Sequence, residues 1–248
     1  MNKSRAALLA ATAFLACVSG AHATTVDIVF EPRTVYNASG ISATAVSSAQ
    51  MAGMTVTMCF AEVITCDTAT WGGSAIGASG TGWSFQAGND TFLNPFLISV
   101  ETGRLLQSFT LYGLGGLTVF DTVFDSLFAA PTSILKDSPG SGNGRPFRLV
   151  GNQPDIFGIV VEYFDKVYVD NVDYNDLYLG MKVSFTMNSG LSGFAGELRF
   201  ESDTDRVIAG GTLAPVTPTG PNPVPLPGTL ALVGAALLGL GLTRRRRS

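Results

Sequence analysis

The stretch Met181-Lys182-Val183-Ser184-Phe185-Thr186-Met187 alternates between apolar and polar residues without a break. Successive side chains of a β-strand point to opposite faces, so this pattern predicts a strand with one buried face and one solvated face. The same alternation recurs at residues 26–30, 54–60 and 198–200. Other short runs predict further strands at residues 96–100, 108–112, 117–122, 147–150 and 159–169.

Turn-forming residues fill the gaps between these expected strands. Glycine, asparagine, aspartate and serine gather at residues 113–116 and 138–144, and residues 72–82 are rich in small residues that are typical of a loop. No segment before residue 220 shows the apolar stripe of an amphipathic helix. Short strands separated by turns predict an all-β fold, and we expect an antiparallel β-sandwich of jelly-roll-like type at residues 24–213.

The N-terminus has the layout of a secretory signal peptide, residues 1–23. Two basic residues precede an apolar segment at residues 6–18, and Ala21 and Ala23 are small residues at the positions that signal peptidase reads. We therefore expect export by the secretion machinery and cleavage after Ala23. Two alternatives are a lipoprotein signal cut before Cys17 and a permanent membrane helix, for which the apolar segment is too short.

The C-terminus carries a second apolar segment. Residues 226–242 hold no charge, and a helix of that length rises about 25 Å, close to the thickness of a hydrocarbon core. An arginine cluster follows and marks the cytoplasmic side of a membrane: Arg244, Arg245, Arg246 and Arg247. We expect a Pro-rich linker with a sorting motif at residues 214–228 and a transmembrane helix with a cytoplasmic end at residues 229–248. The alternative is a buried core helix, which length alone would allow.

The residues before this helix read Val224-Pro225-Leu226-Pro227-Gly228. Together with the apolar helix and the arginines, they resemble the PEP-CTERM sorting signal of Gram-negative bacteria that make exopolysaccharide. Leu226 stands where that family usually has a glutamate. The resemblance implies recognition by an exosortase, a membrane cysteine transpeptidase that cleaves near the proline motif. The body would then be anchored at the inner membrane on the periplasmic side, and later reach the cell surface or the medium.

Two cysteines remain in the expected mature chain, Cys59 and Cys66. An even pair in an oxidising compartment favours a disulfide, and the six residues between them suit the neck of a hairpin. The alternative is two free thiols in a core. Two cysteines without histidine are too few for a zinc site.

Composition excludes several classes of function. The one histidine of the chain is His22, inside the signal, so histidine-based nucleophile systems and histidine-based metal sites are excluded from the mature protein. All 19 acidic residues lie in the body, whereas two of the 15 basic residues lie in the signal and four in the tail. The body therefore carries 19 acidic and nine basic residues, a net charge near −10, which argues against nucleic-acid binding.

Aspartates interleaved with asparagines form the densest acidic run, and Asp170, Asp173 and Asp176 are its candidate calcium ligands. Their spacing does not match an EF-hand loop, and a solvated hairpin turn explains the same residues. A second oxygen cluster, Asp203-Thr204-Asp205, follows the expected strand at residues 198–200. Apart from calcium, we expect no cofactor.

Aromatic residues offer a platform for sugar rings, and Trp71 and Tyr168 are the candidate glycan contacts. The alternative is core packing, which we expect for Tyr163 from its place in the apolar phase of its strand. Paired carboxylates could also hydrolyse a glycan, but nothing in the sequence singles out a pair. Some proteins with this tail are catalogued as ice-binding. An ice-binding face needs a repeated threonine array, and the sequence offers Thr55 and Thr57 without a continuation.

These observations together predict an exported, non-enzymatic surface or extracellular-matrix protein. Its expected partners are signal peptidase, an exosortase-like transpeptidase, the inner membrane and, from the resemblance, exopolysaccharide. Two alternatives stay open, a carbohydrate-binding module and a carboxylate-based glycan hydrolase.

Overall fold

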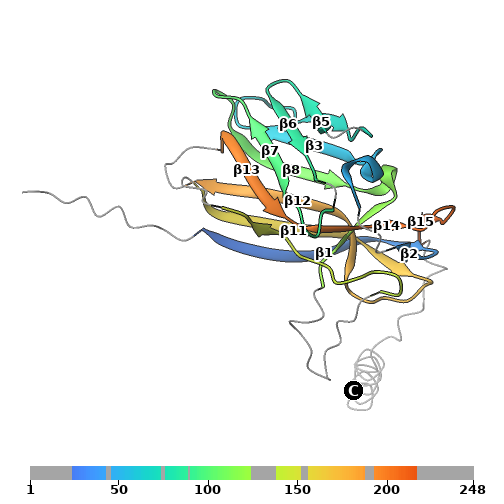
Figure 1. Ribbon diagram of the computed structural model, residues 1–248. Helices are drawn as coiled ribbons and strands as arrows, with labels where there is room; N and C mark the ends of the chain where they lie inside the picture. Colours follow the sequence, from blue (N-terminus) through green and yellow to red (C-terminus); the bar gives the residue numbers. More distant parts are fainter. Residues whose placement is uncertain are drawn as a thin grey trace, which may run out of the picture.

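The computed structural model describes residues 24–42, 46–73, 76–88, 90–123, 138–151, 156–187 and 193–216, and these ranges form an all-β fold (Figure 1). Two short 3-10 helices interrupt the strands, η1 (Ser48–Met51) and η2 (Leu114–Gly116). The strands are β1 (Thr25–Ala38), β2 (Ile41–Ser42), β3 (Thr55–Phe60), β4 (Asp67–Thr70), β5 (Ile76–Gly80), β6 (Trp83–Gln86), β7 (Phe96–Val100), β8 (Leu106–Tyr112), β9 (Thr118–Asp121), β10 (Arg148–Leu149), β11 (Ile156–Val169), β12 (Leu177–Met187), β13 (Gly196–Glu201), β14 (Asp203–Val207) and β15 (Leu213–Pro215).

Two sheets form the fold. The larger has ten strands, ordered β15-β1-β11-β12-β8-β3-β4, with β9 pairing to β12, β14 to β9, and β2 to β14. The smaller has five strands, ordered β10-β13-β7-β6-β5. In Figure 1 the smaller sheet lies over the larger one, and their facing sides enclose the main core. The prediction of an all-β fold with mostly antiparallel sheets is confirmed.

One pair departs from the expected antiparallel arrangement. Strand β1 runs parallel to β11, with Val26 opposite Ile159 and Phe30 opposite Tyr163. Parallel strands need a long connection, and here more than one hundred residues of chain separate the two. Turn signals between sequence neighbours cannot reveal such a pairing, which explains why the expectation of a purely antiparallel sandwich was wrong at this place.

Aromatic side chains dominate the main core. The rings of Phe96 and Phe200 stack with centroids 5.1 Å apart, and Phe200 also stacks on Phe109 at 5.4 Å and on Phe147 at 4.9 Å. Each such ring contributes a large apolar area, and offset pairs add about 0.5–1.5 kcal/mol beyond area burial. A smaller cluster lies apart, made of Ala38, Ile41, Val119, Val167, Val169, Leu177, Leu179 and Val207.

Most strands expected from alternation are present, within β1, β3, β12 and β13, and those from shorter runs within β7, β8, β9, β10 and β11. The expected loop at residues 72–82 is wrong in part, because β5 occupies five of its eleven residues. Glycine is required there by packing: a Cβ atom on Gly77 would collide with the Trp71 ring. The small residues thus make room for a buried indole, and their composition imitates a loop.

Candidate functional site

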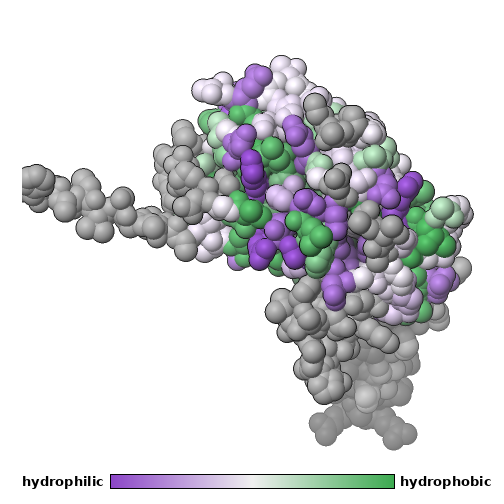
Figure 2. Space-filling view, viewed as in Figure 1, coloured by the Kyte–Doolittle hydropathy of each residue, from purple (hydrophilic) through white to green (hydrophobic). Residues whose placement is uncertain are grey.

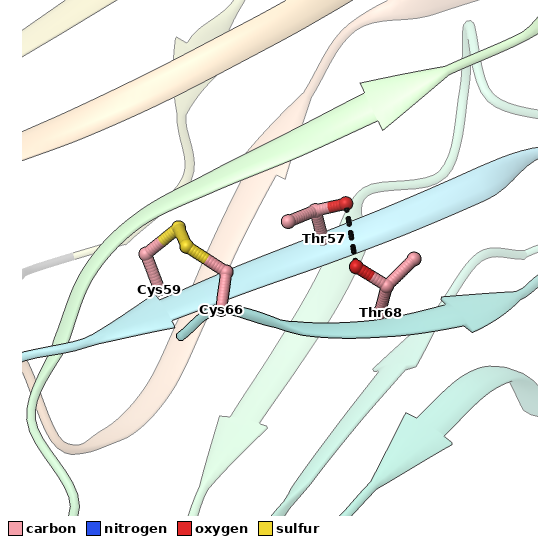
Figure 3. Close-up of a disulfide and its surroundings, with 4 residues drawn as sticks. All are labelled: Thr57, Cys59, Cys66 and Thr68. Carbon is pink, nitrogen blue, oxygen red and sulfur yellow. Dashed lines mark hydrogen bonds between the residues drawn. A yellow bond between two sulfur atoms is a disulfide. The ribbon is translucent and has the colours of Figure 1, made fainter. Parts of the chain in front are cut away.

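The predicted disulfide is formed in the structure. Cys59 lies in β3, Cys66 directly precedes β4, and the bond joins the two strands at the neck of their hairpin (Figure 3). Cross-strand pairs tie the rest of this hairpin together, with Thr55 opposite Thr70 and Thr57 opposite Thr68. The bridge therefore holds a hairpin whose neighbouring strands are already in register.

A face of hydroxyl groups continues from this disulfide. The Thr57 and Thr68 hydroxyls lie 3.1 Å apart, on the side of the sheet that carries the bridge (Figure 3). Strand β3 also pairs with β8, its neighbour away from β4, and there Thr57 is opposite Thr110. These side chains form what we call the threonine face: Thr55, Thr57, Thr68, Thr70 and Thr110.

The side chains of the threonine face are evenly spaced, because strands and residues are evenly spaced in a β-sheet. Neighbouring strands lie about 4.8 Å apart, and alternate residues along one strand are about 6.8 Å apart. Thr68 and Thr70 are exposed, while the other three are half-buried. The expectation that Thr55 and Thr57 have no continuation was wrong, because their continuation is on β4 and β8. Only the strand register, which the sequence does not reveal, brings these residues together.

A cation borders this face. Lys182 of β12 is opposite Thr110, and Ser184 is opposite Ser108, so hydroxyl groups extend onto a further strand. Among the residues that the structure describes, Lys182 makes no ion pair, although Glu162 is its partner on β11. The Glu162 carboxylate instead contacts Arg33. The ammonium group thus stands beside uncharged hydroxyls.

The two aromatic candidates lie apart from this face. Trp71 is 1 % exposed, and its Nε1 donates to the Ser48 carbonyl oxygen at 2.9 Å and is 3.1 Å from the Ser48 hydroxyl. Its prediction as a glycan contact is therefore wrong in this structure, because no face of the indole reaches the surface. Tyr168 is half-buried, and burial together with Asp173 raises the pKa of its hydroxyl. Tyr163 is fully buried, as expected.

The three calcium candidates do not converge. Asp173 binds Lys166 through an Nζ–Oδ2 contact of 2.7 Å, and Asp176 accepts hydrogen bonds from the Ser138 backbone N–H at 2.6 Å and hydroxyl at 2.8 Å. Asp170 is exposed in a turn where its φ is 50°. Within the described ranges, no three acidic or cysteine side chains are grouped as metal ligands. The structure favours the turn interpretation for Asp170 and Asp173, whereas Asp176 is 0 % exposed and does not lie in a solvated turn.

A second group of acids lies inside the protein. Asp121 ends β9, and Asp203 and Asp205 belong to the neighbouring strand β14, with Asp121 opposite Asp203. Asp121 and Asp205 are 0 % and 3 % exposed. The Ser141 hydroxyl lies 2.5 Å from Asp121 Oδ2 and also contacts Asp205 Oδ2. Sequence reasoning found two of these acids as an oxygen cluster, but it placed no acid in the interior.

The hydrogen bonds require one of these acids to hold a proton. A serine hydroxyl has a single hydrogen, so it can donate to only one of two carboxylates. Burial raises the pKa of Asp121 to about 9, opposed by hydrogen bonds from Ser141 and the Val123 N–H and reinforced by the charges of Asp205 and Asp176. Burial also raises the pKa of Asp203 to about 7, with Asp205 adding to the rise. The raised pKa favours Asp121 as the acid that holds the proton at neutral pH.

This acid cluster secures the segment at residues 138–145. The Gly144 N–H donates to the Val123 carbonyl at 2.6 Å, and the Arg145 N–H donates to the Asp121 carbonyl at 3.0 Å. Arg145 continues to Glu201, with an Nη1–Oε2 contact of 2.5 Å. The polar groups thus hold residues 138–145 against the sheet, and Asp121 and Asp205 are buried beneath this segment.

Several expected sites lie outside the described residues: the signal cleavage residues Ala21 and Ala23, the motif from Val224 to Gly228, and the arginines from Arg244 to Arg247. The expected transmembrane helix lies there as well. In the part of the chain that the structure describes, no helix has the length and apolar character needed to cross a membrane. On the surface in view, hydrophilic and hydrophobic residues are mixed (Figure 2).

Comparisons with protein-family models, with curated proteins and with solved structures gave no match. The function is therefore argued from the residues of the chain itself.

Proposed function

We propose that this chain is an exported, non-enzymatic surface or extracellular-matrix protein, carried to its place by a C-terminal signal of the PEP-CTERM type. The observation that carries the proposal is the bond between Cys59 and Cys66, because disulfides persist in oxidising compartments outside the cytosol. The signal-like N-terminus and the arginine-ended tail support the same route. A jelly-roll-like strand arrangement and a membrane-spanning C-terminal helix belong to this proposal.

Three features support a non-enzymatic body. No histidine remains after removal of residues 1–23. The acids whose pKa is raised most, Asp121 and Asp203, are sealed in the interior and serve as hydrogen-bonding partners. Lys166 and Arg145 are both engaged in ion pairs, with Asp173 and Glu201. These groups stabilise the fold and are not directed at a bound molecule.

Intact-mass analysis of the protein from cell envelope and medium tests the proposal. We expect loss of residues 1–23, a deficit of two hydrogens for the disulfide, and loss of the tail in the released form. A variant with Pro225→Ala and Pro227→Ala should keep its tail and stay in the envelope. A matched variant, Pro221→Ala with Pro223→Ala, changes the same spacer outside the motif and should be processed normally. Full-length chain in the cytosol with both termini intact would refute the proposal.

A second candidate function is carbohydrate binding, and the threonine face favours it. Its hydroxyls both donate and accept hydrogen bonds, which suits a polyhydroxylated ligand. Threonine rotamers are few and the Cys59–Cys66 bridge holds the hairpin, so little side-chain freedom is lost when a ligand binds. Lys182 at the border adds a site for a negative group on such a ligand.

Binding of purified exopolysaccharide and of a glycan array tests this candidate. The double variant Thr57→Val with Thr68→Val keeps the side-chain shape and removes both hydroxyls, so binding should fall at least tenfold. Thr186→Val is the matched control, since Thr186 is an exposed threonine of the same sheet outside the threonine face. Equal binding by all three proteins would exclude this face. Thermal hysteresis with no glycan binding would assign the face to ice instead.

A further inference from the structure

The outer edge of β1 is open over much of its length. On one side, β1 pairs with β11 through Thr25 to Glu31 in an unbroken register. On the other side, only residues 36–38 have a partner, in β15. Among the described strands, none therefore pairs with residues 25–34 on that side, and Figure 1 shows β1 running along the border of the larger sheet.

The second half of this edge is protected, whereas the first half is not. Proline, bulges and charged residues are the usual means by which an edge strand avoids pairing with another chain. Pro32 has no N–H to donate, and it lies in the irregular register between Glu31 and Val35. Residues 25–31 contain no proline and no bulge, and they form a regular edge of seven residues in which Asp27 and Glu31 are the charged residues.

Apolar side chains are exposed along this regular part. Val29 is 41 % exposed and Phe30 is 48 % exposed. The Phe30 ring packs against Tyr163 and Tyr178, with centroid distances of 5.7 and 5.3 Å, so one side of the ring belongs to the core and the other side remains uncovered. A further strand added to β1 would cover this open side.

We propose that the partner is a second copy of this chain, and that two β1 edges pair antiparallel about a two-fold axis at Ile28. In this register Val26 of one copy is opposite Phe30 of the other, and Asp27 is opposite Val29. Apolar residues then meet on the inner face, and neither acidic residue, Asp27 or Glu31, meets another acid.

Charge disfavours the two neighbouring registers, with the axis at Asp27 or at Val29, which keep the same faces. Moving the axis to Asp27 puts Asp27 opposite its own copy. Moving it to Val29 puts Asp27 opposite Glu31 in two symmetric places. Like charges directly opposite each other across an antiparallel pair are destabilising. A two-fold interface uses the same residues twice, so each unfavourable pair would also count twice.

Cysteine cross-linking of the full chain, in the envelope of cells that export it, tests both the partner and the register. Opposed residues of an antiparallel pair have Cα atoms about 4.5–5.5 Å apart, which a disulfide spans. Ile28→Cys should give a disulfide-linked dimer on non-reducing gels. Asp27→Cys and Val29→Cys should cross-link at least tenfold less, while Thr25→Cys combined with Glu31→Cys should cross-link again.

Charge variants give an independent measurement on the extracted protein by light scattering. Val29→Asp places an acid opposite Asp27 in two symmetric pairs and should weaken dimerisation about tenfold. Val29→Lys places a cation there and should restore or tighten it. Val63→Asp is the matched control, because Val63 is 43 % exposed in the β3–β4 hairpin, which lies far from β1 in the sheet, and it should leave the dimer unchanged.

Three results would overturn the proposal. One is the absence of a dimer from Ile28→Cys in protein whose Cys59–Cys66 bond is intact. Another is stronger cross-linking by Val29→Cys or Asp27→Cys, which would assign a different register. The third is an equal effect of Val29→Asp and Val63→Asp on the molar mass.

Discussion

Replacing Asp121 with asparagine should stabilise the protein in alkaline solution and remove most of its pH dependence there. Asparagine keeps the size of the side chain, so its carbonyl oxygen can still accept from the Val123 N–H, which lies 3.1 Å from Asp121 Oδ1. Its side-chain amide can keep a hydrogen bond with the Ser141 hydroxyl, which lies 2.5 Å from Asp121 Oδ2. The substitution therefore removes one ionisable proton and leaves the hydrogen bonds in place.

The size of the effect follows from the raised pKa. The pKa of Asp121 is about 9 in the folded protein, against about 3.9 in an unfolded chain. Between these values the folded protein holds the proton that the unfolded chain has lost, so stability is fully present below pH 4 and is lost as pH rises through 9. The free energy of unfolding falls by about 1.4 kcal/mol per pH unit, or about 4 kcal/mol between pH 5 and pH 8.

Asp203 behaves in the same way over a narrower range. Its pKa of about 7 ends its contribution near that pH. Above pH 7 the remaining slope belongs to Asp121, and this range separates the two acids. In the Asp121→Asn variant the free energy of unfolding should be nearly constant from pH 7 to pH 9. Its decrease with rising pH should be confined to the range below pH 7, where Asp203 titrates.

Urea denaturation of the purified protein at one-unit pH intervals from 5 to 9 provides the measurement. Asp170→Asn is the matched control, since Asp170 is an exposed aspartate in a turn, and its slope should equal that of the wild type. If the variant retains the wild-type slope between pH 7 and pH 9, or is less stable than the wild type at pH 8, Asp121 is not the buried acid that we infer.

Three further predictions concern stability. Replacing Cys59 and Cys66 together by serine should cost about 2–3 kcal/mol in urea denaturation without changing the circular dichroism spectrum; an unchanged midpoint would show that the bridge does not constrain the hairpin. Gly77→Ala should cost about 1–3 kcal/mol because its Cβ meets the Trp71 ring, whereas Gly73→Ala, with only one atom at 4.0 Å, should cost little; equal costs would contradict this packing. A chelator should leave the melting temperature unchanged, and a shift on adding Ca²⁺ would revive the calcium site.

Alternation revealed the fold class because it reflects burial directly. Phe96, Ile98 and Val100 alternate with half-buried residues in β7, as the apolar pattern requires. The pattern failed where burial depends on distant chain. Asp121 would face water in an isolated hairpin, but residues 138–145 cover it. Likewise, Thr68 and Thr70 become part of the threonine face only because they lie beside Thr55 and Thr57, and the pairing of the strands determines that register.

The glycine-rich segment failed for a different reason. Small residues mark both flexible loops and places where a large side chain packs closely, and composition does not separate the two. Here the large side chain is Trp71, only six residues away from Gly77. The same burial that explains the glycine excludes Trp71 from the surface. The contact between Gly77 and Trp71 therefore explains why two predictions failed, the loop at residues 72–82 and the surface position of Trp71.

The distribution of charge links stability to the surface of the protein. The formal charge of the body treats every carboxyl as ionised, yet burial raises the pKa of Asp121 to about 9 and that of Asp203 to about 7. Part of the acidic composition is therefore hidden as neutral hydrogen-bonding groups, while the threonine face exposes hydroxyls and has Lys182 at its border. An anionic polysaccharide approaching that face would meet less repulsion than the composition suggests. Acidification from pH 8 to pH 5 would stabilise the fold, because the folded protein binds protons at Asp121 and Asp203 that the unfolded chain has lost.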